Sequence, residues 1–313
     1  LTLIVFLVSQ LFLWFTLFQS EFLFFDLNTW IRWDSGHYLA IAKNNYEFFP
    51  CAGKFGYPLD AKELCGNTGW FPGYPMLVNL FSLIFNNYEL VGVYLSKLFY
   101  FLSIFLIVLL SQIDKLSFKN IIFLLIPTFF FGFIYYNAVF PISMVLFFSL
   151  LAFYFFFKNY IWLVGLCSSI VAFTYPTGFL LSIAFAIHIF IDFLMSRDPK
   201  MLLKSFLISF IGILGILLVF INFHIQVGEW SAFNQVQAKY GHGLHNPLSM
   251  MLVTFKQSFN FTLQNTPNIQ TVLVILFYVF VSFIFFYKKL NHNKLYLLAF
   301  IYSSLFFILP WIV

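Results

Sequence analysis

Charged residues are scarce in this chain: Asp, Glu, Lys and Arg together make up only 9% of its 313 residues. Hydrophobic residues make up 62%, and the mean hydropathy is +0.93. Soluble domains contain about 25% charged residues, so this composition excludes a water-soluble globular protein. We therefore expect a polytopic membrane protein.

The chain also lacks the short motifs of several enzyme classes. No glycine-rich phosphate loop follows a strand-like segment, no Cys/His spacing is typical of a metal site, and no internal repeat is evident. Nucleotide-driven chemistry is thus unsupported, and we expect no metal, no cofactor and no nucleic-acid partner. An enzyme that acts outside the cytoplasm would instead need a substrate carried by a lipid.

Cysteine is rare, with three residues in the whole chain. Cys167 lies inside an apolar run, whereas Cys51 and Cys65 lie in a polar stretch. These two can form a disulfide only if their loop faces an oxidising compartment, and they remain thiols in a reducing one.

The ends of the chain carry two ambiguities. There is no initiator Met, and residues 295–313 are still an apolar run, which leaves open that the chain is a fragment at both ends. A signal peptide is the competing interpretation of residues 1–18. No small-residue cleavage site follows them, and the run is long enough to span, so we interpret it as a transmembrane helix.

Long apolar runs set the expected fold, because about twenty apolar residues are needed to cross the hydrocarbon core as a helix. We count about nine candidate spans, with a polar stretch at 21–88 and another at 224–270. The sequence therefore predicts an all-α membrane protein forming a single domain over 1–313. The candidate spans are 1–20, 89–112, 118–134, 138–157, 160–174, 178–195, 204–223, 271–287 and 295–313.

The distribution of charge predicts the orientation, because Lys and Arg concentrate in cytoplasmic connections. With the N-terminus inside, the short cytoplasmic connections hold Lys115, Lys119, Lys158, Arg197, Lys200, Lys204, Lys288, Lys289 and Lys294. The opposite side receives most acids, namely Glu21, Asp26, Asp34, Glu47, Asp60, Glu63, Glu89 and Glu229. Both polar stretches are therefore expected to be large extracytoplasmic loops.

One polar cluster stands out in the first loop, where Arg32, Asp34 and His37 lie within six residues of one another. Ionisable groups beside a membrane segment are functional candidates. Asp34 is a candidate catalytic base, because desolvation and the nearby Arg32 act on its proton affinity in opposite directions. The alternative is a helix cap or an ion pair with Arg32. His37 either orients a substrate or is a surface histidine bonded to backbone.

Three further features follow this cluster, two before the second span and one inside it. Residues 70–75 combine two prolines with aromatic side chains, including Tyr74, and read either as an interfacial aromatic belt or as a wall of a substrate cleft. An interfacial helix is expected over 76–85. Lys97 lies about two turns inside the second span, where it either snorkels to the interface or meets an anion.

The second loop carries aromatic and amide side chains over 228–241, including Gln235 and Lys239. This composition suits a sugar or a lipid headgroup, although an ordinary interfacial loop has the same composition. His188, in the middle of the sixth run, is expected to be a hydrogen-bond partner between helices rather than a ligand.

Taken in order, these segments resemble the bacterial branch of the PIG-V-like mannosyltransferases, relatives of the second mannosyltransferase of GPI-anchor synthesis. The resemblance covers nearly the whole chain, and its most specific part is the first motif together with the Phe-Pro-x-Tyr-Pro pattern. The matching segments are Arg32–Ala42, Phe71–Pro75, Asn137–Pro141, Thr174–Gly178 and Trp230–Gln237. Tyr175 stands where the resemblance would place an arginine.

The resemblance implies a GT-C glycosyltransferase: a protein with many transmembrane helices, its catalytic acid in the first extracytoplasmic loop and a polyprenyl-phosphate sugar as donor. Asp34 would be the catalytic base, and transfer of a hexose, expected to be mannose, would invert the anomeric carbon. Arg32, Lys97 and Lys239 would meet the phosphate, while His37, Tyr74 and Gln235 would complete substrate binding. The acceptor, a glycan, lipid or protein, is not specified.

Two other functions remain open at this stage. A transporter or flippase for lipid-linked glycans would carry charges and broken helices deep in the membrane, whereas the polar residues here concentrate in loops on one side. A non-catalytic subunit of a glycan-assembly complex would retain the same fold without turnover. In each case the protein is an integral multi-pass membrane protein surrounded by lipid.

Overall fold

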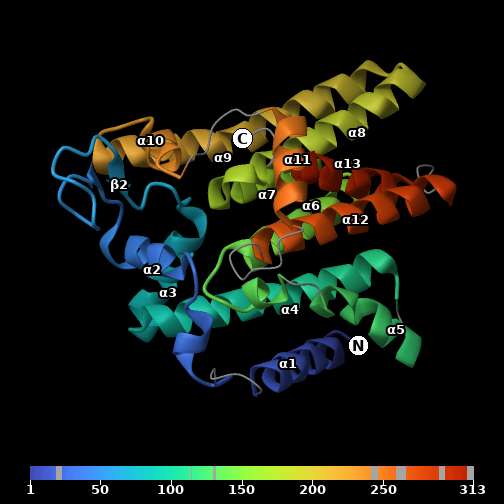
Figure 1. Ribbon diagram of the computed structural model, residues 1–313. Helices are drawn as coiled ribbons and strands as arrows, with labels where there is room; N and C mark the ends of the chain where they lie inside the picture. Colours follow the sequence, from blue (N-terminus) through green and yellow to red (C-terminus); the bar gives the residue numbers. More distant parts are fainter. Residues whose placement is uncertain are drawn as a thin grey trace. The chain divides into compact units, whose positions relative to one another are not determined.

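The computed structural model describes residues 1–18, 23–113, 115–129, 132–240, 246–258, 266–288 and 293–308 (Figure 1). The described structure is 76% helical, and its sheet content is one two-stranded hairpin. The all-α class is thereby confirmed. Glu21 and Lys289, which were used for the orientation, lie outside the described residues.

The chain divides into two compact units, where the sequence predicts one domain. Unit 1 comprises 1–182 and 207–239, and unit 2 comprises 183–206 and 240–313. Unit 1 holds the first polar stretch, and we describe each unit by itself.

Three segments are long and apolar enough to cross a membrane by length and composition. They are α4 (Tyr88–Ser111), α8 (Leu180–Ser196) together with the turn that precedes it from Pro176, and α9 (Pro199–Val227). This supports a membrane protein. Shorter apolar helices are α1 (Thr2–Phe18), α3 (Gly73–Phe85), α6 (Ile142–Phe157), α7 (Ile161–Thr174) and α13 (Lys294–Ile308), and α12 (Thr266–Tyr287) contains another such stretch. The count of nine spans stays a prediction.

The run predicted as one span over 118–134 is not a single continuous α-helix. Helix α5 covers only Phe118–Leu125 and is followed by a 3-10 turn at Ile126–Phe129. Pro127 lies in that turn, and proline disrupts a helix interior because it has no backbone N–H to donate. A second 3-10 turn at Phe133–Tyr136 leads into the segment that supports the first polar motif.

Close contacts at glycine hold the core of unit 1 together. A Cβ on Gly92 of α4 would lie 2.9 Å from the side chain of Val139, and Val139 itself is fully buried. The backbone N–H of Val139 donates to the carbonyl of Trp30 at 2.9 Å. Glycine at position 92 therefore lets segment 138–140 approach α4 closely, and that segment in turn holds the start of the polar motif.

Most of the first polar stretch is folded. It forms α2 (Ser35–Asn44), the antiparallel strands β1 (Phe48–Pro50) and β2 (Leu64–Gly66), and α3, the helix expected at the interface, which begins at Gly73 rather than Met76. The sequence leaves open whether Cys51 and Cys65 are bonded, and in the structure a disulfide joins them. Cys167 is a buried free thiol.

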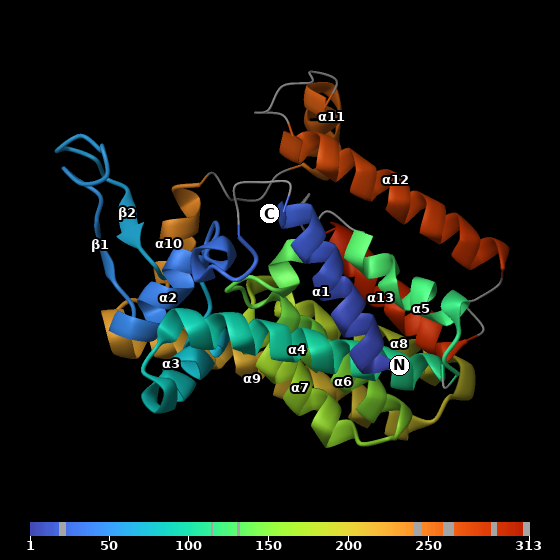
Figure 2. The same ribbon diagram turned by 90° about the horizontal axis from the view of Figure 1, so that it is seen from below.

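A short helix from the second polar stretch packs against the first. Helix α10 (Ala232–Ala238) accepts a hydrogen bond from Thr68 through its Ala232 carbonyl at 3.1 Å, and Gln237 donates to the Gly69 carbonyl at 3.0 Å. The hairpin, α2 and α10 consequently gather at one end of unit 1 (Figure 2). Parts of the two long polar stretches thus meet in space.

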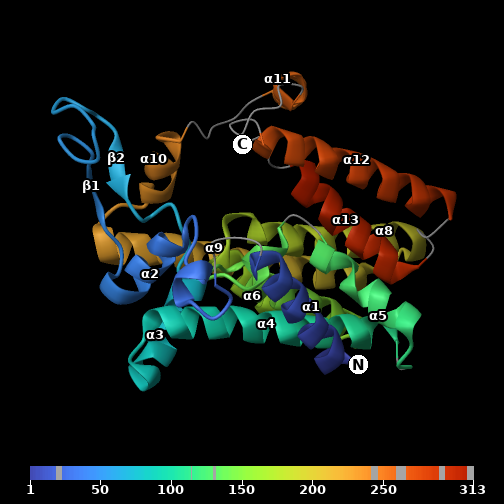
Figure 3. The same cartoon turned by 60° about the horizontal axis from the view of Figure 1, so that its bottom comes forward.

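Unit 2 contains α11 (Pro247–Ser258), α12 and α13. Helices α12 and α13 are both labelled in Figure 3. Stacked aromatic rings join them: the Phe285 and Phe300 centroids lie 4.3 Å apart, as do those of Tyr278 and Phe307. A hydrogen bond between the Tyr278 and Ser304 hydroxyls adds a polar contact to this aromatic packing.

Candidate functional site

The first polar motif is held by backbone and hydroxyl hydrogen bonds. The Ser35 hydroxyl donates to the Val139 carbonyl at 2.9 Å and accepts from the Arg32 backbone N–H at 3.0 Å. Trp30 is 1% exposed, and its indole N–H donates to the Phe24 carbonyl. Residues on both sides of Asp34 are therefore anchored, which leaves little freedom in the position of Asp34 itself.

Trp33 has an unusual backbone conformation, with φ at 48°. A bulky residue in this left-handed region is uncommon and costs on the order of 1–3 kcal/mol, and such residues cluster at functional sites. The indole is 58% exposed, and its centroid lies 4.5 Å from that of Tyr135. The turn thus presents an aromatic pair next to Asp34.

Asp34 is the residue before α2, yet its side chain makes no capping hydrogen bond. Within the described ranges it also forms no ion pair with Arg32, whose Nε donates instead to the Thr29 carbonyl at 3.1 Å. Asp34 is therefore neither a side-chain cap of α2 nor the ion-pair partner of Arg32 in the described residues. Its carboxylate is half-buried and is not engaged in holding the fold.

Three tyrosine side chains interact electrostatically with this carboxylate. Burial raises the pKa of Tyr38, Tyr135 and Tyr175, and the negative charge of Asp34 raises the pKa of each further. These groups therefore stay neutral and can donate hydrogen bonds. Tyr175, the position where the family resemblance would place an arginine, thus contributes a neutral donor near Asp34 instead of a cation.

His37 follows Asp34 by three residues. Its imidazole stacks on the Trp70 ring, with centroids 3.5 Å apart and ring planes 12° from parallel. Burial lowers the pKa of His37, Asp34 opposes that effect, and Lys239 adds to it. The imidazole is therefore neutral near pH 7 and able to accept or donate a hydrogen bond. His37 is therefore stacked on the Trp70 ring rather than exposed as a free surface histidine.

The second loop contributes Lys239 to this region, whereas Gln235 points into its own helix. The charge of Lys239 acts on His37, and its Nζ lies 3.9 Å from Cys65 Sγ. Gln235 donates to the Ser231 hydroxyl at 2.6 Å, and that hydroxyl donates to Glu229. The structure thus brings Lys239 toward the motif, while Gln235 belongs to a local network at the start of α10.

Lys97 is directed at aromatic rings. Its Nζ lies 4.3 Å from the ring centroid of Trp30 and 4.6 Å from that of Phe24. Cation–π contacts of this kind are favourable for a partly desolvated cation. Lys97 consequently approaches the motif from the side of Trp30.

Tyr74 is fully buried, and its hydroxyl donates to the Gly92 carbonyl at 2.7 Å and lies 2.8 Å from the Ser96 hydroxyl. These bonds tie α3 to α4. The burial does not favour the predicted substrate-binding role of Tyr74, which stays a prediction.

Two other acids of the first polar stretch and its border with α4, Asp26 and Glu89, are engaged elsewhere. Asp26 accepts from the Asn28 backbone N–H at 3.0 Å and caps a 3-10 turn, while Glu89 forms an ion pair with Lys43 at 2.5 Å. Of Asp26, Asp34 and Glu89, only Asp34 has a carboxylate that neither caps a turn nor forms an ion pair.

Sequence reasoning missed Tyr135 and the ring of Trp33. A signal for Tyr135 was present, because residues 134–137 break the apolar run directly before the Asn137–Pro141 segment. Trp70 was noted only as a member of an aromatic segment. In the described part of the chain, no group of three or more His, Cys, Asp or Glu side chains is arranged to hold a metal ion.

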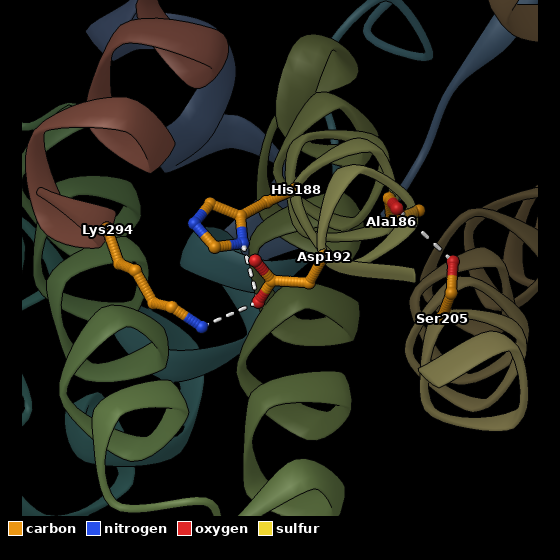
Figure 4. A network of polar contacts seen from close by, with 5 residues as sticks. All are labelled: Ala186, His188, Asp192, Ser205 and Lys294. Carbon is orange, nitrogen blue, oxygen red and sulfur yellow. Dashed lines mark hydrogen bonds and ion pairs between the residues drawn. The ribbon is translucent and has the colours of Figure 1, made fainter. Parts of the chain in front are cut away.

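A second polar cluster lies in unit 2 (Figure 4). Lys294, at the start of α13, pairs with Asp192 of α8 at 2.8 Å, and His188 Nδ1 lies 3.9 Å from the same carboxylate oxygen. Ser205 of α9 donates to the Ala186 carbonyl. The contact joins the end of α8 to the start of α13, two helix ends that the predicted topology places together on the cytoplasmic side.

Comparison with known proteins identifies no relative: no family model matches the chain, and neither the curated proteins nor the solved structures contain a match.

Proposed function

We propose that the chain is a GT-C glycosyltransferase of the PIG-V-like kind, which transfers a hexose, mannose in the first instance, from a polyprenyl phosphate to an acceptor outside the cytoplasm. The observation that carries the proposal is the half-buried Asp34 carboxylate. It has no capping bond or ion pair in the described residues, and its neighbours in the motif, Trp33 and His37, form ring contacts with Tyr135 and Trp70.

In the proposed reaction, Asp34 takes the proton of the acceptor hydroxyl while that oxygen bonds to the anomeric carbon. The bond from the anomeric carbon to the phosphate oxygen breaks, and its electron pair leaves with the polyprenyl phosphate. Attack on the face opposite the leaving group gives one inversion, as in inverting glycosidases. Protonated Asp34 then releases its proton to water.

The aromatic pairs suit the sugar. The C–H faces of a hexose ring are apolar and pack against aromatic rings, and the neutral phenols of Tyr135 and Tyr175, which are only partly buried, can hydrogen-bond to its hydroxyls. These contacts would orient the sugar relative to Asp34.

The leaving phosphate gains charge and requires cations. Lys97 and Lys239 approach the motif from α4 and from the end of α10, and Arg32 is part of it. Three cations at or near one short motif would suit a departing phosphate. We further propose that this site faces away from the cytoplasm, in keeping with the charge asymmetry of the connections.

The test is Asp34→Asn in purified protein supplied with labelled polyprenyl-phosphate mannose and candidate acceptors. Asn keeps the shape but cannot take a proton, so kcat should fall by about 10²–10⁴-fold, with donor binding retained. The matched control is Asp60→Asn, an exposed acid of the same loop, which should transfer sugar normally. Equal turnover by Asp34→Asn and the parent protein would remove Asp34 from the base's role, and donor binding without transfer to any acceptor would favour a non-catalytic subunit.

A further inference from the structure

Unit 1 contains a cavity of about 610 Å³ that the proposed reaction does not use. Its wall is formed by the end of α2, the start of α3 and residues of α6, α7 and α9. The volume lies in the range of small-molecule sites. None of the proposed catalytic or phosphate-binding residues lines it.

The start of α3 is shaped to form one wall of this cavity. A Cβ on Gly73 would lie 2.4 Å from the Thr174 hydroxyl oxygen and 2.9 Å from its Cα. Only glycine therefore allows α3 to begin directly against the end of α7. The Phe-Pro-Gly-Tyr-Pro segment thus has a structural reason for its central glycine.

The polar side chains in the lining are Tyr46 and four carboxamides: Asn45, Asn79, Asn222 and Gln226. A chain of hydrogen bonds fixes two of them. The Tyr46 backbone N–H donates to Gln226 Oε1 at 3.0 Å, and Gln226 Nε2 donates to Asn222 Oδ1 at 2.9 Å. This assigns the amide orientation of Asn222 and leaves its Nδ2 as the remaining donor.

That Nδ2 atom is buried and has no hydrogen-bond acceptor in the described part of the chain. A buried donor without an acceptor is unfavourable, and most such groups in folded proteins are satisfied. A ligand oxygen in the cavity would supply the missing acceptor. Asn79, whose Nδ2 donates to the Ala42 carbonyl, offers its Oδ1 for the opposite role.

The remaining lining is apolar, with side chains such as Leu77, Met144, Ile170 and Phe173, and no charged residue lines the cavity. At the lip, Leu80 is 56% exposed, and the apolar surface of α3 continues to Ile84, which is 71% exposed. In the predicted topology all these residues lie at the extracytoplasmic ends of their helices. A ligand with an apolar part and a polar part at headgroup depth matches this arrangement.

We propose that this cavity binds an uncharged, hydroxyl-bearing lipid headgroup with its first methylenes, that is, a neutral glycolipid. Carboxamides both donate and accept hydrogen bonds, as sugar hydroxyls do. A phosphate or carboxylate headgroup would be desolvated without a cation to pair it, which disfavours anionic lipids. The inference depends on the cavity alone and not on sugar transfer.

The test measures equilibrium binding of radiolabelled monoglucosyl diacylglycerol to the purified full chain in detergent. Phosphatidylglycerol with the same acyl chains and diacylglycerol without a headgroup serve as competitors. The labelled lipid should bind saturably, and both competitors should displace it at least tenfold less effectively than unlabelled glycolipid. Equal displacement by either competitor, or no saturable binding, would overturn the proposal.

Two variants and a control locate the ligand. Asn222→Leu removes the unpaired donor and should weaken binding about tenfold, as expected for one hydrogen bond of about 1.4 kcal/mol. Leu80→Trp narrows the lip at an exposed position and should weaken binding in a chain that folds normally. Asn44→Leu changes an exposed amide outside the cavity and should leave binding unchanged. Unaltered binding in both cavity variants would place the lipid elsewhere.

Measuring the same binding to Asp34→Asn separates this inference from the proposed function. Retained binding with lost transfer supports two distinct sites. Lost binding in Asp34→Asn would place the glycolipid in the aspartate site and overturn the inference, whereas binding by a protein that never transfers sugar would count against the transferase alone.

Discussion

Removing the disulfide should loosen the hairpin and leave the aspartate site in place. The bond joins Cys51 to Cys65 across a sequence separation of 14, so it closes a loop of about fifteen residues, for which the loss of chain entropy on cross-linking corresponds to about 3 kcal/mol. The two strands have only three residues each, and such a short hairpin is marginal by itself.

The effect should be local because other contacts hold the neighbouring segments. The Tyr46 hydroxyl donates to the Trp70 carbonyl at 2.7 Å, and Gln237 and Thr68 connect the residues after β2 to α10. These bonds do not depend on the disulfide. We therefore expect the His37–Trp70 stack to survive its removal.

Hydrogen–deuterium exchange followed by mass spectrometry tests this on the double variant Cys51→Ser/Cys65→Ser. A loss of 3 kcal/mol corresponds to about a hundredfold faster exchange, which is expected in residues 48–66 and not in α2 or α10. Cys167→Ser is the control, since it removes a buried thiol that makes no cross-link. Unchanged exchange in the hairpin would refute the entropic reasoning, and equal loosening of α2 would refute its locality.

Three other predictions address burial, pH and topology. Tyr74→Phe removes a buried hydroxyl and should cost about 1–2 kcal/mol of stability by thermal unfolding with an unchanged KM for donor; a raised KM at normal stability would make Tyr74 a substrate contact. Because burial lowers the pKa of His37 below 6.5, its neutral form contributes stability above pH 6.5 that is lost as the pH falls through the lower folded-state pKa, and His37→Gln should flatten the melting temperature between about pH 5 and 8; a slope equal to the parent's would count against this. Single cysteines at positions 44 and 119 are introduced in a background without native cysteines, and intact cells are treated with an impermeant thiol reagent. The cysteine that replaces Asn44 should react and the one that replaces Lys119 should be protected. The reverse pattern would invert the topology.

Local composition was sufficient to predict several elements. Apolar runs located α4, α8 and α9 to within a few residues, since a membrane helix must be both long and apolar. The disulfide was recognisable because two cysteines shared one polar stretch. The break after α5 was also encoded locally, in Pro127, but the long apolar context concealed it.

Only contacts between distant segments decided which candidates meet. Tyr74, an aromatic residue in a promising motif, turned out to be buried against Gly92 and Ser96, and Gln235 to be bonded to Ser231, because packing rather than residue type determines which face of a helix is covered. Tyr135 gained its interest from a neighbour about a hundred residues away, the Trp33 ring.

The sequence by itself determined that this protein is helical and has segments long and apolar enough to span a membrane, and it singled out Asp34, because hydropathy and the scarcity of charge are properties of short segments. The tertiary structure decided that Asp34 makes no capping bond while Trp33 and His37 beside it contact Tyr135 and Trp70, that Lys97 and Lys239 approach the same motif, and that four carboxamides line one cavity. These arrangements depend on side chains far apart in the chain, and their proximity is fixed by how the helices pack, which no local pattern records.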